Sequence, residues 1–191
     1  MRIVILAFMA VLGLQTSAQG IKKMRVMPDD TRVITTTLCN YAKGNGMFGK
    51  TLKMGMSHIT YADADNTFAI IFPITTDHYI VLPAGKRAII KQANGNVVTL
   101  ENVHNIDKSD NSRSLDDRFT VYPEYAVSAK QLAELKRSEV VKIRLETDTD
   151  EYVDIDRKDF SKQWMFNKYL QQCHNVLKWK IEEEKGIYKG F

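Results

Sequence analysis

A short helix that leads directly into a strand is the most constraining feature of this sequence. Ser128 has the residue type of a helix N-cap, and Gln131 three positions later completes a capping box. Apolar residues then recur at a helical spacing of three, at Ala129, Leu132 and Leu135. Residues 141–146 instead alternate between apolar and charged side chains, which predicts a strand with one buried and one solvent-exposed face. A helix and a strand joined so tightly can bury their apolar faces in one core.

The first eighteen residues have the features of an export signal. Arg2 precedes an apolar stretch from Ile3 to Leu14, and small residues follow up to Ala18. The apolar stretch has twelve residues, which are too few to span a bilayer comfortably as a helix. We therefore expect cleavage near Ala18, before Gln19, and a periplasmic or secreted mature protein without a membrane span.

Residues 19–191 are enough for one domain with a substantial core, because a chain of this size buries roughly 70% of its extended surface on folding. We expect a single α+β domain, preceded at residues 19–30 by a polar, basic segment that is either a loose arm or a lead-in strand. The signal contains one of the 27 basic side chains, so 26 face 23 acidic ones, a net charge of +3. This balance does not predict a polyanion as partner, and we expect no nucleic acid.

The chain has two cysteines, Cys39 and Cys173. An oxidising compartment permits them to form a disulfide. The alternative is that both are small buried side chains that pack as hydrophobes. Sequence determines neither their separation nor their geometry, so both alternatives stay open at this point.

Several segments have the composition of strands, and short turns between them favour an antiparallel meander. Asn94-Gly95 is the strongest local signal, because both central residues of a type I′ turn need positive φ, and it joins residues 87–93 to residues 96–100. The other expected strands are 31–41, 47–61, 67–72, 78–82, 119–125 and 152–155. A polar loop is expected between His104 and Arg118.

The C-terminal segment predicts a long helix over residues 158–184, roughly 40 Å in length, with Gly186 as its stop signal. Aromatic and basic residues interleave on and beyond this helix. The candidate binding residues among them are Trp179, Lys180, Lys185 and Tyr188. On the inner stripe of the helix such residues are core, whereas an exposed outer face would form a partner-binding patch.

No segment contains a complete catalytic motif, and we predict no catalytic residue. The sequence around Ser57, Gly-Met-Ser-His-Ile, begins like a nucleophile elbow but lacks the second glycine, so a strand with a polar edge is the alternative. Cys173 and His174 are adjacent on the predicted helix, where neighbouring side chains do not face each other.

Metal and cofactor sites also lack sequence support. The histidines are isolated from one another, and no Cys-x-x-Cys pair is present. The acidic residues near Asp63 lack the glycine and the glutamate of a calcium loop. A second acidic cluster, residues 146–159, does not by its spacing place two carboxylates in one cleft, as a glycosidase needs. We predict no metal and no cofactor.

Two stretches resemble the small exported proteins of Bacteroidetes that lack an assigned function. The first is the hairpin of residues 87–91 and 94–100, and the second is the helix start and strand of residues 125–132 and 141–146. They lie within residues 87–146, a span of about a third of the chain. Some of these proteins are similar to TATA-box-binding-protein-like α+β folds, with a curved antiparallel sheet and helices on one face. The resemblance implies a fold and export, but no active site, and the loop after His104 has no counterpart in it.

These observations predict an α+β fold: a twisted antiparallel sheet of about six strands, with the helix from Ala129 and the C-terminal helix on one face. The leading functional hypothesis is a non-enzymatic exported binding or interaction module for an envelope or extracellular protein. One alternative is a small periplasmic hydrolase, which would need a histidine beside Ser57 or paired acids in one cleft. The other is a small-ligand carrier, with its ligand in the concavity of the sheet.

Overall fold

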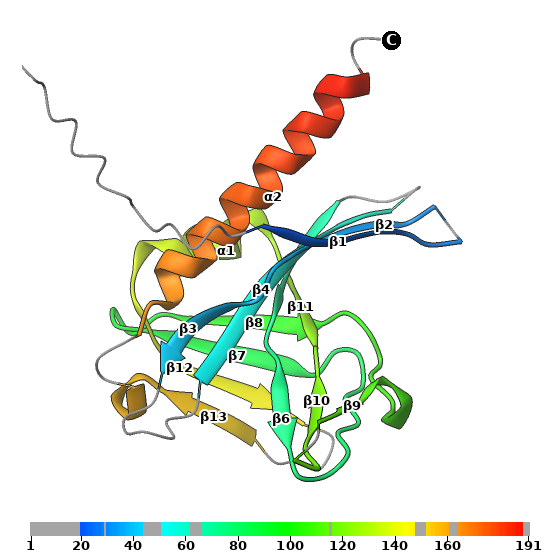
Figure 1. The fold of residues 1–191 in the computed structure, drawn as a ribbon. Helices are drawn as coiled ribbons and strands as arrows, with labels where there is room; N and C mark the ends of the chain where they lie inside the picture. Colours follow the sequence, from blue (N-terminus) through cyan, green and yellow to red (C-terminus); the bar gives the residue numbers. More distant parts are fainter. Residues whose placement is uncertain are drawn as a thin grey trace, which may run out of the picture.

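The computed structural model describes residues 20–28, 30–43, 51–61, 66–114, 116–147, 152–160 and 164–188. The predicted signal, its cleavage point and the acidic residues near Asp63 lie outside these ranges. The described chain forms an α+β fold in which antiparallel strands predominate and two α-helices pack against them (Figure 1). Among the described residues, no helix is both long enough and apolar enough to cross a membrane.

The main sheet has ten strands, so the prediction of about six is wrong. The prediction missed strands because the first one is polar and because residues 31–41 divide into two strands. The order along the sheet is β1 (Ile21–Val26), β2 (Arg32–Thr36), β4 (Thr51–Thr60), β5 (Thr67–Ile71), β11 (Glu124–Val127), β8 (Val97–Asn102), β7 (Arg87–Gln92), β12 (Val140–Glu146) and β13 (Tyr152–Asp156), while β3 (Cys39–Lys43) pairs with the start of β4. Strand β1 is an edge strand, exposed over most of its length.

A second, three-stranded sheet has the order β6 (Ile74–Thr76), β10 (Phe119–Val121) and β9 (Ser112–Arg113). It lies at the end of the molecule opposite the helices (Figure 1). The expected strand at 78–82 is absent, since only Leu82 forms an isolated bridge, to Ile106. The expected loop after His104 contains β9 and the 3-10 helix η1 (Lys108–Asp110).

The hairpin of β7 and β8 forms as predicted, but its turn type differs. The amide of Gly95 donates to the carbonyl of Gln92 at 3.0 Å, and the amide of Gln92 donates to the carbonyl of Asn96 at 2.9 Å. Gly95 has φ +89°, whereas Asn94 is not among the described residues with positive φ. The chain therefore makes an ordinary turn followed by a glycine in the left-handed region, the longer hairpin arrangement, and not a two-residue type I′ turn.

Both predicted helices are present. Helix α1 (Ala129–Arg137) has the expected capping box: the Gln131 amide donates to the Ser128 hydroxyl at 3.2 Å, and Gln131 Oε1 accepts from the Ser128 amide at 2.9 Å. Helix α2 (Phe166–Tyr188) begins later than expected, because residues 157–160 form the 3-10 helix η2 (Arg157–Phe160). The two α-helices contact each other, and α2 also packs on β2, β3 and β4.

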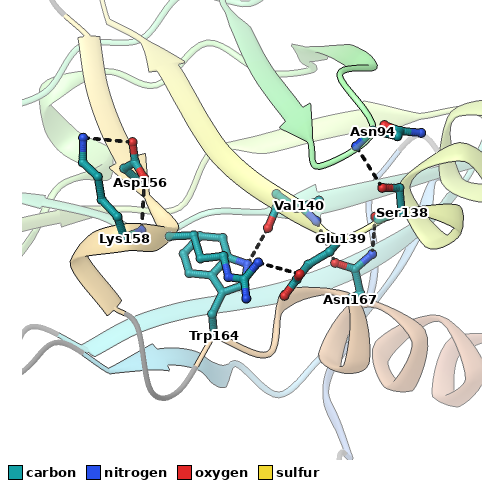
Figure 2. A network of polar contacts seen from close by, with 9 residues as sticks. Asn94, Ser138, Glu139, Val140, Asp156, Lys158, Trp164 and Asn167 are labelled. Atoms are coloured by element: carbon teal, nitrogen blue, oxygen red, sulfur yellow. Dashed lines mark hydrogen bonds and ion pairs between the residues drawn. The ribbon is translucent and has the colours of Figure 1, made fainter.

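A polar network joins the end of α1 to the start of α2 (Figure 2). Asn167 Nδ2 donates to the carbonyls of Leu135 and Ser138, at 2.7 and 2.8 Å, while Asn167 Oδ1 accepts from the Val140 amide at 3.0 Å. Trp164 Nε1 donates to the Val140 carbonyl at 2.6 Å. Because the last carbonyls of a helix lack partners inside it, this network has a structural role in ending α1.

The main sheet has two distinct faces, which we call the helix face and the outer face. Phe68 lies on the helix face, since its ring centroid is 5.3 Å from that of His174 on α2. Successive residues of a strand point to opposite faces. Ser57 pairs with Thr35 and Ala69, and all three therefore lie on the outer face, away from α2.

Candidate functional site

A cavity of about 520 Å³ lies against the outer face, and we call it the outer cavity. Strands β1, β2 and β4 contribute one part of its lining, and the start of β11 and the segment after β8 contribute the other. Apolar and charged side chains both line it: Val33, Ile59, Ile106, Arg25, Asp110 and Glu124. This volume falls in the usual range for small-molecule sites, which combine apolar walls with a few polar groups.

Glu124 is held in the wall of this cavity by a buried serine. The Ser57 side chain is fully buried, and its hydroxyl donates to Glu124 Oε2 at 2.5 Å. The two residues come from β4 and β11, with β5 between them in the sheet, and Ile71 of β5 pairs with Glu124. A charge-assisted hydrogen bond of this kind fixes the orientation of the carboxylate.

The charged groups of the outer cavity are not neutralised by one another. Within the described part of the chain, neither Glu124, Asp110 nor Arg25 belongs to a salt bridge. Glu124 is half-buried, whereas Asp110 and Arg25 are exposed. Solvent screens an exposed charge more strongly, so Glu124 contributes the largest electrostatic effect inside the cavity.

Asn102, another residue of the cavity lining, has an unsatisfied acceptor. Its Nδ2 donates to the carbonyls of Pro83 and His104, at 3.4 and 2.5 Å. Its Oδ1 is buried and has no hydrogen-bond partner among the described residues. A buried acceptor without a donor carries a desolvation penalty that a partner would remove.

The structure does not place a histidine beside Ser57, as the hydrolase hypothesis required. His58 follows Ser57 in β4 and points to the helix face, where its ring centroid is 4.8 Å from that of Phe68. Burial, followed by the nearby Lys185, lowers the pKa of His58. His104 lines the outer cavity but makes no hydrogen bond to Ser57. Ser57 therefore acts as a donor to a carboxylate, and because its side chain is fully buried its hydroxyl is not exposed to a substrate.

Three acids of residues 146–159, Glu146, Asp154 and Asp156, are engaged with basic side chains. Asp154 accepts from Arg144 at 2.7 Å and lies 3.0 Å from Lys142 Nζ. The hydrogen bond from Arg144 holds the pKa of Asp154 well below its usual range. Glu146 accepts from Arg87, and Asp156 lies 3.4 Å from Lys158 Nζ. Among the described residues, no group of three or more His, Cys, Asp or Glu side chains could hold a metal ion.

The candidate binding residues of the C-terminal helix lie away from the outer cavity. Trp179 is 61% exposed on α2, which packs on the helix face. Lys180 Nζ lies 2.6 Å from Glu183, and Lys185 lines a small hollow of about 130 Å³ with Arg32 and His58. Tyr188 is the last residue of α2, and its side chain lies outside what the structure describes.

The two cysteines are brought together by the fold. Cys39 lies in β3 and Cys173 in α2, and their Sγ atoms are 4.0 Å apart in the core. Cys39 Sγ is also 3.3 Å from the Met54 carbonyl oxygen, and Thr36 Oγ1 lies 3.7 Å from Cys173 Sγ. The contact with Cys173, together with burial, raises the pKa of Cys39.

Sequence reasoning missed Arg25, Asn102, Asp110 and Glu124 as residues of a site. One signal was available for Glu124: it is the single charged residue between Phe119 and Val127. Strand alternation places it on the face of Ala126, opposite the buried Tyr125. No signal in the sequence connects it to Ser57, which lies 67 positions earlier.

Comparisons with protein families, with curated proteins and with solved structures found no match. The candidate site therefore depends on the geometry of this chain alone. The resemblance to exported Bacteroidetes proteins and to a TATA-box-binding-protein-like fold stays a prediction.

Proposed function

We propose that this protein is a non-enzymatic binding protein that takes a small amphipathic amine into the outer cavity. The observation that carries the proposal is Glu124, a half-buried carboxylate that is oriented by Ser57 and has no cationic partner among the described residues. An ammonium group can supply the missing positive charge and donate its N–H groups to the Glu124 carboxylate.

The apolar part of the lining supports an amphipathic ligand over a bare cation. Val33, Ile59 and Ile106 provide surface that a hydrocarbon body can cover, which adds hydrophobic free energy to the ionic contact. A free inorganic cation would gain nothing from these side chains.

The other two hypotheses have less support. A hydrolase would need a nucleophile that a substrate can reach, whereas the Ser57 side chain is fully buried and His58 packs against Phe68 on the other face. Docking of an envelope or extracellular protein on α2 is supported by the exposed Trp179, but Lys180 is already paired with Glu183. Export to the periplasm or exterior remains part of the proposal, as the compartment in which the ligand would be met.

Two probes of equal length and opposite charge test the proposal: n-hexylammonium and n-hexanoate, titrated by calorimetry and by NMR chemical shifts. We expect saturable binding of the ammonium and at least tenfold weaker binding of the carboxylate. Glu124→Gln should reduce ammonium affinity about tenfold, because it removes the charge and keeps the shape. Glu101→Gln is the matched control, since Glu101 is on the same face in β8 but does not line the cavity.

Equal affinity for the two probes would contradict a carboxylate-centred site. Ammonium binding that Glu124→Gln leaves unchanged would show that the amine binds elsewhere. Shift changes confined to α2 would favour the interaction-module hypothesis instead.

A further inference from the structure

We propose that Cys39 and Cys173 are a covalent cross-linking site, and that in the exported protein they form a disulfide that ties β3 to α2. The proposal concerns the fold and is independent of the proposed ligand. It depends on one observation and one separate prediction: the contact of the two thiols in the core, and the export signal predicted from the sequence of residues 1–18.

The thiols already occupy the position that a cross-link requires. Their Sγ atoms are 4.0 Å apart, and a disulfide bond is about 2.05 Å long, so small side-chain adjustments would close the gap. The strand and the helix that hold them are well anchored. Strand β3 pairs with β4, and the start of α2 is fixed by the Asn167 and Trp164 network of Figure 2.

Within the described chain no group of three or more His, Cys, Asp or Glu side chains could hold a metal ion, and the pair contacts the Met54 carbonyl and the Thr36 hydroxyl. Both side chains are buried, so neither is accessible as a surface nucleophile. The chain contains no third cysteine that could compete for either partner.

Burial also determines when the bond forms. An oxidised dithiol catalyst of the export compartment would be attacked by one cysteine thiolate, which gives a mixed disulfide and releases one catalyst thiolate. The second cysteine then attacks the mixed disulfide, forming the Cys39–Cys173 bond and releasing the catalyst as a dithiol. The two cysteines lose two protons and two electrons, and the catalyst disulfide accepts the electrons. Because the folded core excludes a catalyst, this exchange precedes the docking of α2.

The cross-link would close a loop of 134 positions. In the chain-entropy model a loop of this size strongly restricts the unfolded state, so the folded state gains stability. It would also fasten the C-terminal helix to the N-terminal part of the sheet, the two regions of the chain that are farthest apart in sequence.

The test is a thiol count on the full chain, exported with its own leader and purified without reductant. In denaturant, we expect no maleimide labelling before reduction and two labels after it, with an intact mass about 2 Da lower before reduction. Proteolytic mapping should recover the linked peptides. Reduction should lower the Tm by an amount on the order of 10 °C.

Cys39→Ser is the control, because its Tm should not respond to reductant. Two labels on the unreduced exported protein would overturn the proposal. The thiol count uses only the wild-type chain, so it tests the proposal even if a cysteine variant fails to fold. Ammonium binding is measured separately, so loss of the disulfide proposal would leave the proposed function intact.

Discussion

The outer face of the main sheet has two halves, which differ in whether their carboxylates are paired with basic side chains. In the half formed by β7, β12 and β13, which we call the ion-paired half, Arg87 pairs with Glu146 at 2.6 Å and Arg144 with Asp154 at 2.7 Å. In the half formed by β2, β4 and β11, which we call the cavity half, Glu124 has a serine as its partner and no cation among the residues that the structure describes. The same face therefore contains both a neutralised surface and a carboxylate available to a ligand.

The difference shows how a solvated surface can be told from a site. Opposite charges on neighbouring strands stabilise a sheet modestly and satisfy each other, which leaves little for a ligand to gain. A half-buried carboxylate without a cation has lost part of its hydration and gains from a positive partner. Glu146 and Asp154, from the acid-rich segment of the sequence, belong to the first kind, and the isolated Glu124 belongs to the second.

The largest expected difference between the two halves concerns packing. Ile59 is buried in the cavity half, and Ile89 is half-buried in the ion-paired half of the same face. Ile59→Ala should reduce the free energy of unfolding by about 3 kcal/mol, and Ile89→Ala by about 1 kcal/mol, because less apolar surface is lost at the second site. Urea unfolding of both variants measures this. Equal losses would mean that the two halves are packed alike.

The serine that orients Glu124 should have a smaller effect on stability. Ser57→Ala removes one charge-assisted hydrogen bond from a buried position and should cost about 1–2 kcal/mol. Amine affinity should fall several-fold because the carboxylate is less well oriented, and Thr99→Ala on the exposed part of the same face should change neither quantity. Calorimetry and urea unfolding check both effects. Loss of a hydrolytic activity in Ser57→Ala would instead support the hydrolase hypothesis.

Breaking an ion pair in the ion-paired half should reduce the free energy of unfolding by less than either Ile59→Ala or Ser57→Ala. Arg87 is 54% exposed, so solvent screens its end of the pair with Glu146. Arg87→Ala should therefore cost less than 1 kcal/mol and leave ammonium binding unchanged. Thermal unfolding at low and high salt is the measurement, and a large, salt-independent loss would contradict a solvated pair.

The ion pairs of the ion-paired half should make the stability depend on pH in acid. Arg144 lowers the pKa of Asp154, and Arg87 lowers that of Glu146. A carboxylate with a lowered folded-state pKa stabilises the protein above its unfolded pKa of about 4, and this contribution is lost as the pH falls below that value. Asp154→Asn should therefore make the fall in Tm below about pH 4 shallower. An unchanged acid profile in this variant would show that the Asp154 pair contributes nothing to stability.

Sequence patterns predicted the elements whose structure is local. The capping box of Ser128 and Gln131 and the glycine turn at Gly95 depend on residues within a few positions, and both are present. The predictions failed where a strand lacked alternation, as in β1, or where one apolar run became two strands, as at the break before Glu124. An edge strand exposed on both faces has no buried stripe, so its pattern resembles that of a loop.

The sequence by itself determined the α+β class, the capped helix before β12 and the long C-terminal helix, because helix caps, turns and residue periodicity act between near neighbours. Only the tertiary structure decided that β11 lies between β5 and β8, that Ser57 meets Glu124 and that Cys39 meets Cys173. These contacts join residues 67 and 134 positions apart. They depend on strand order and register, which are set by the packing of the whole core and not by the spacing of residues along the chain.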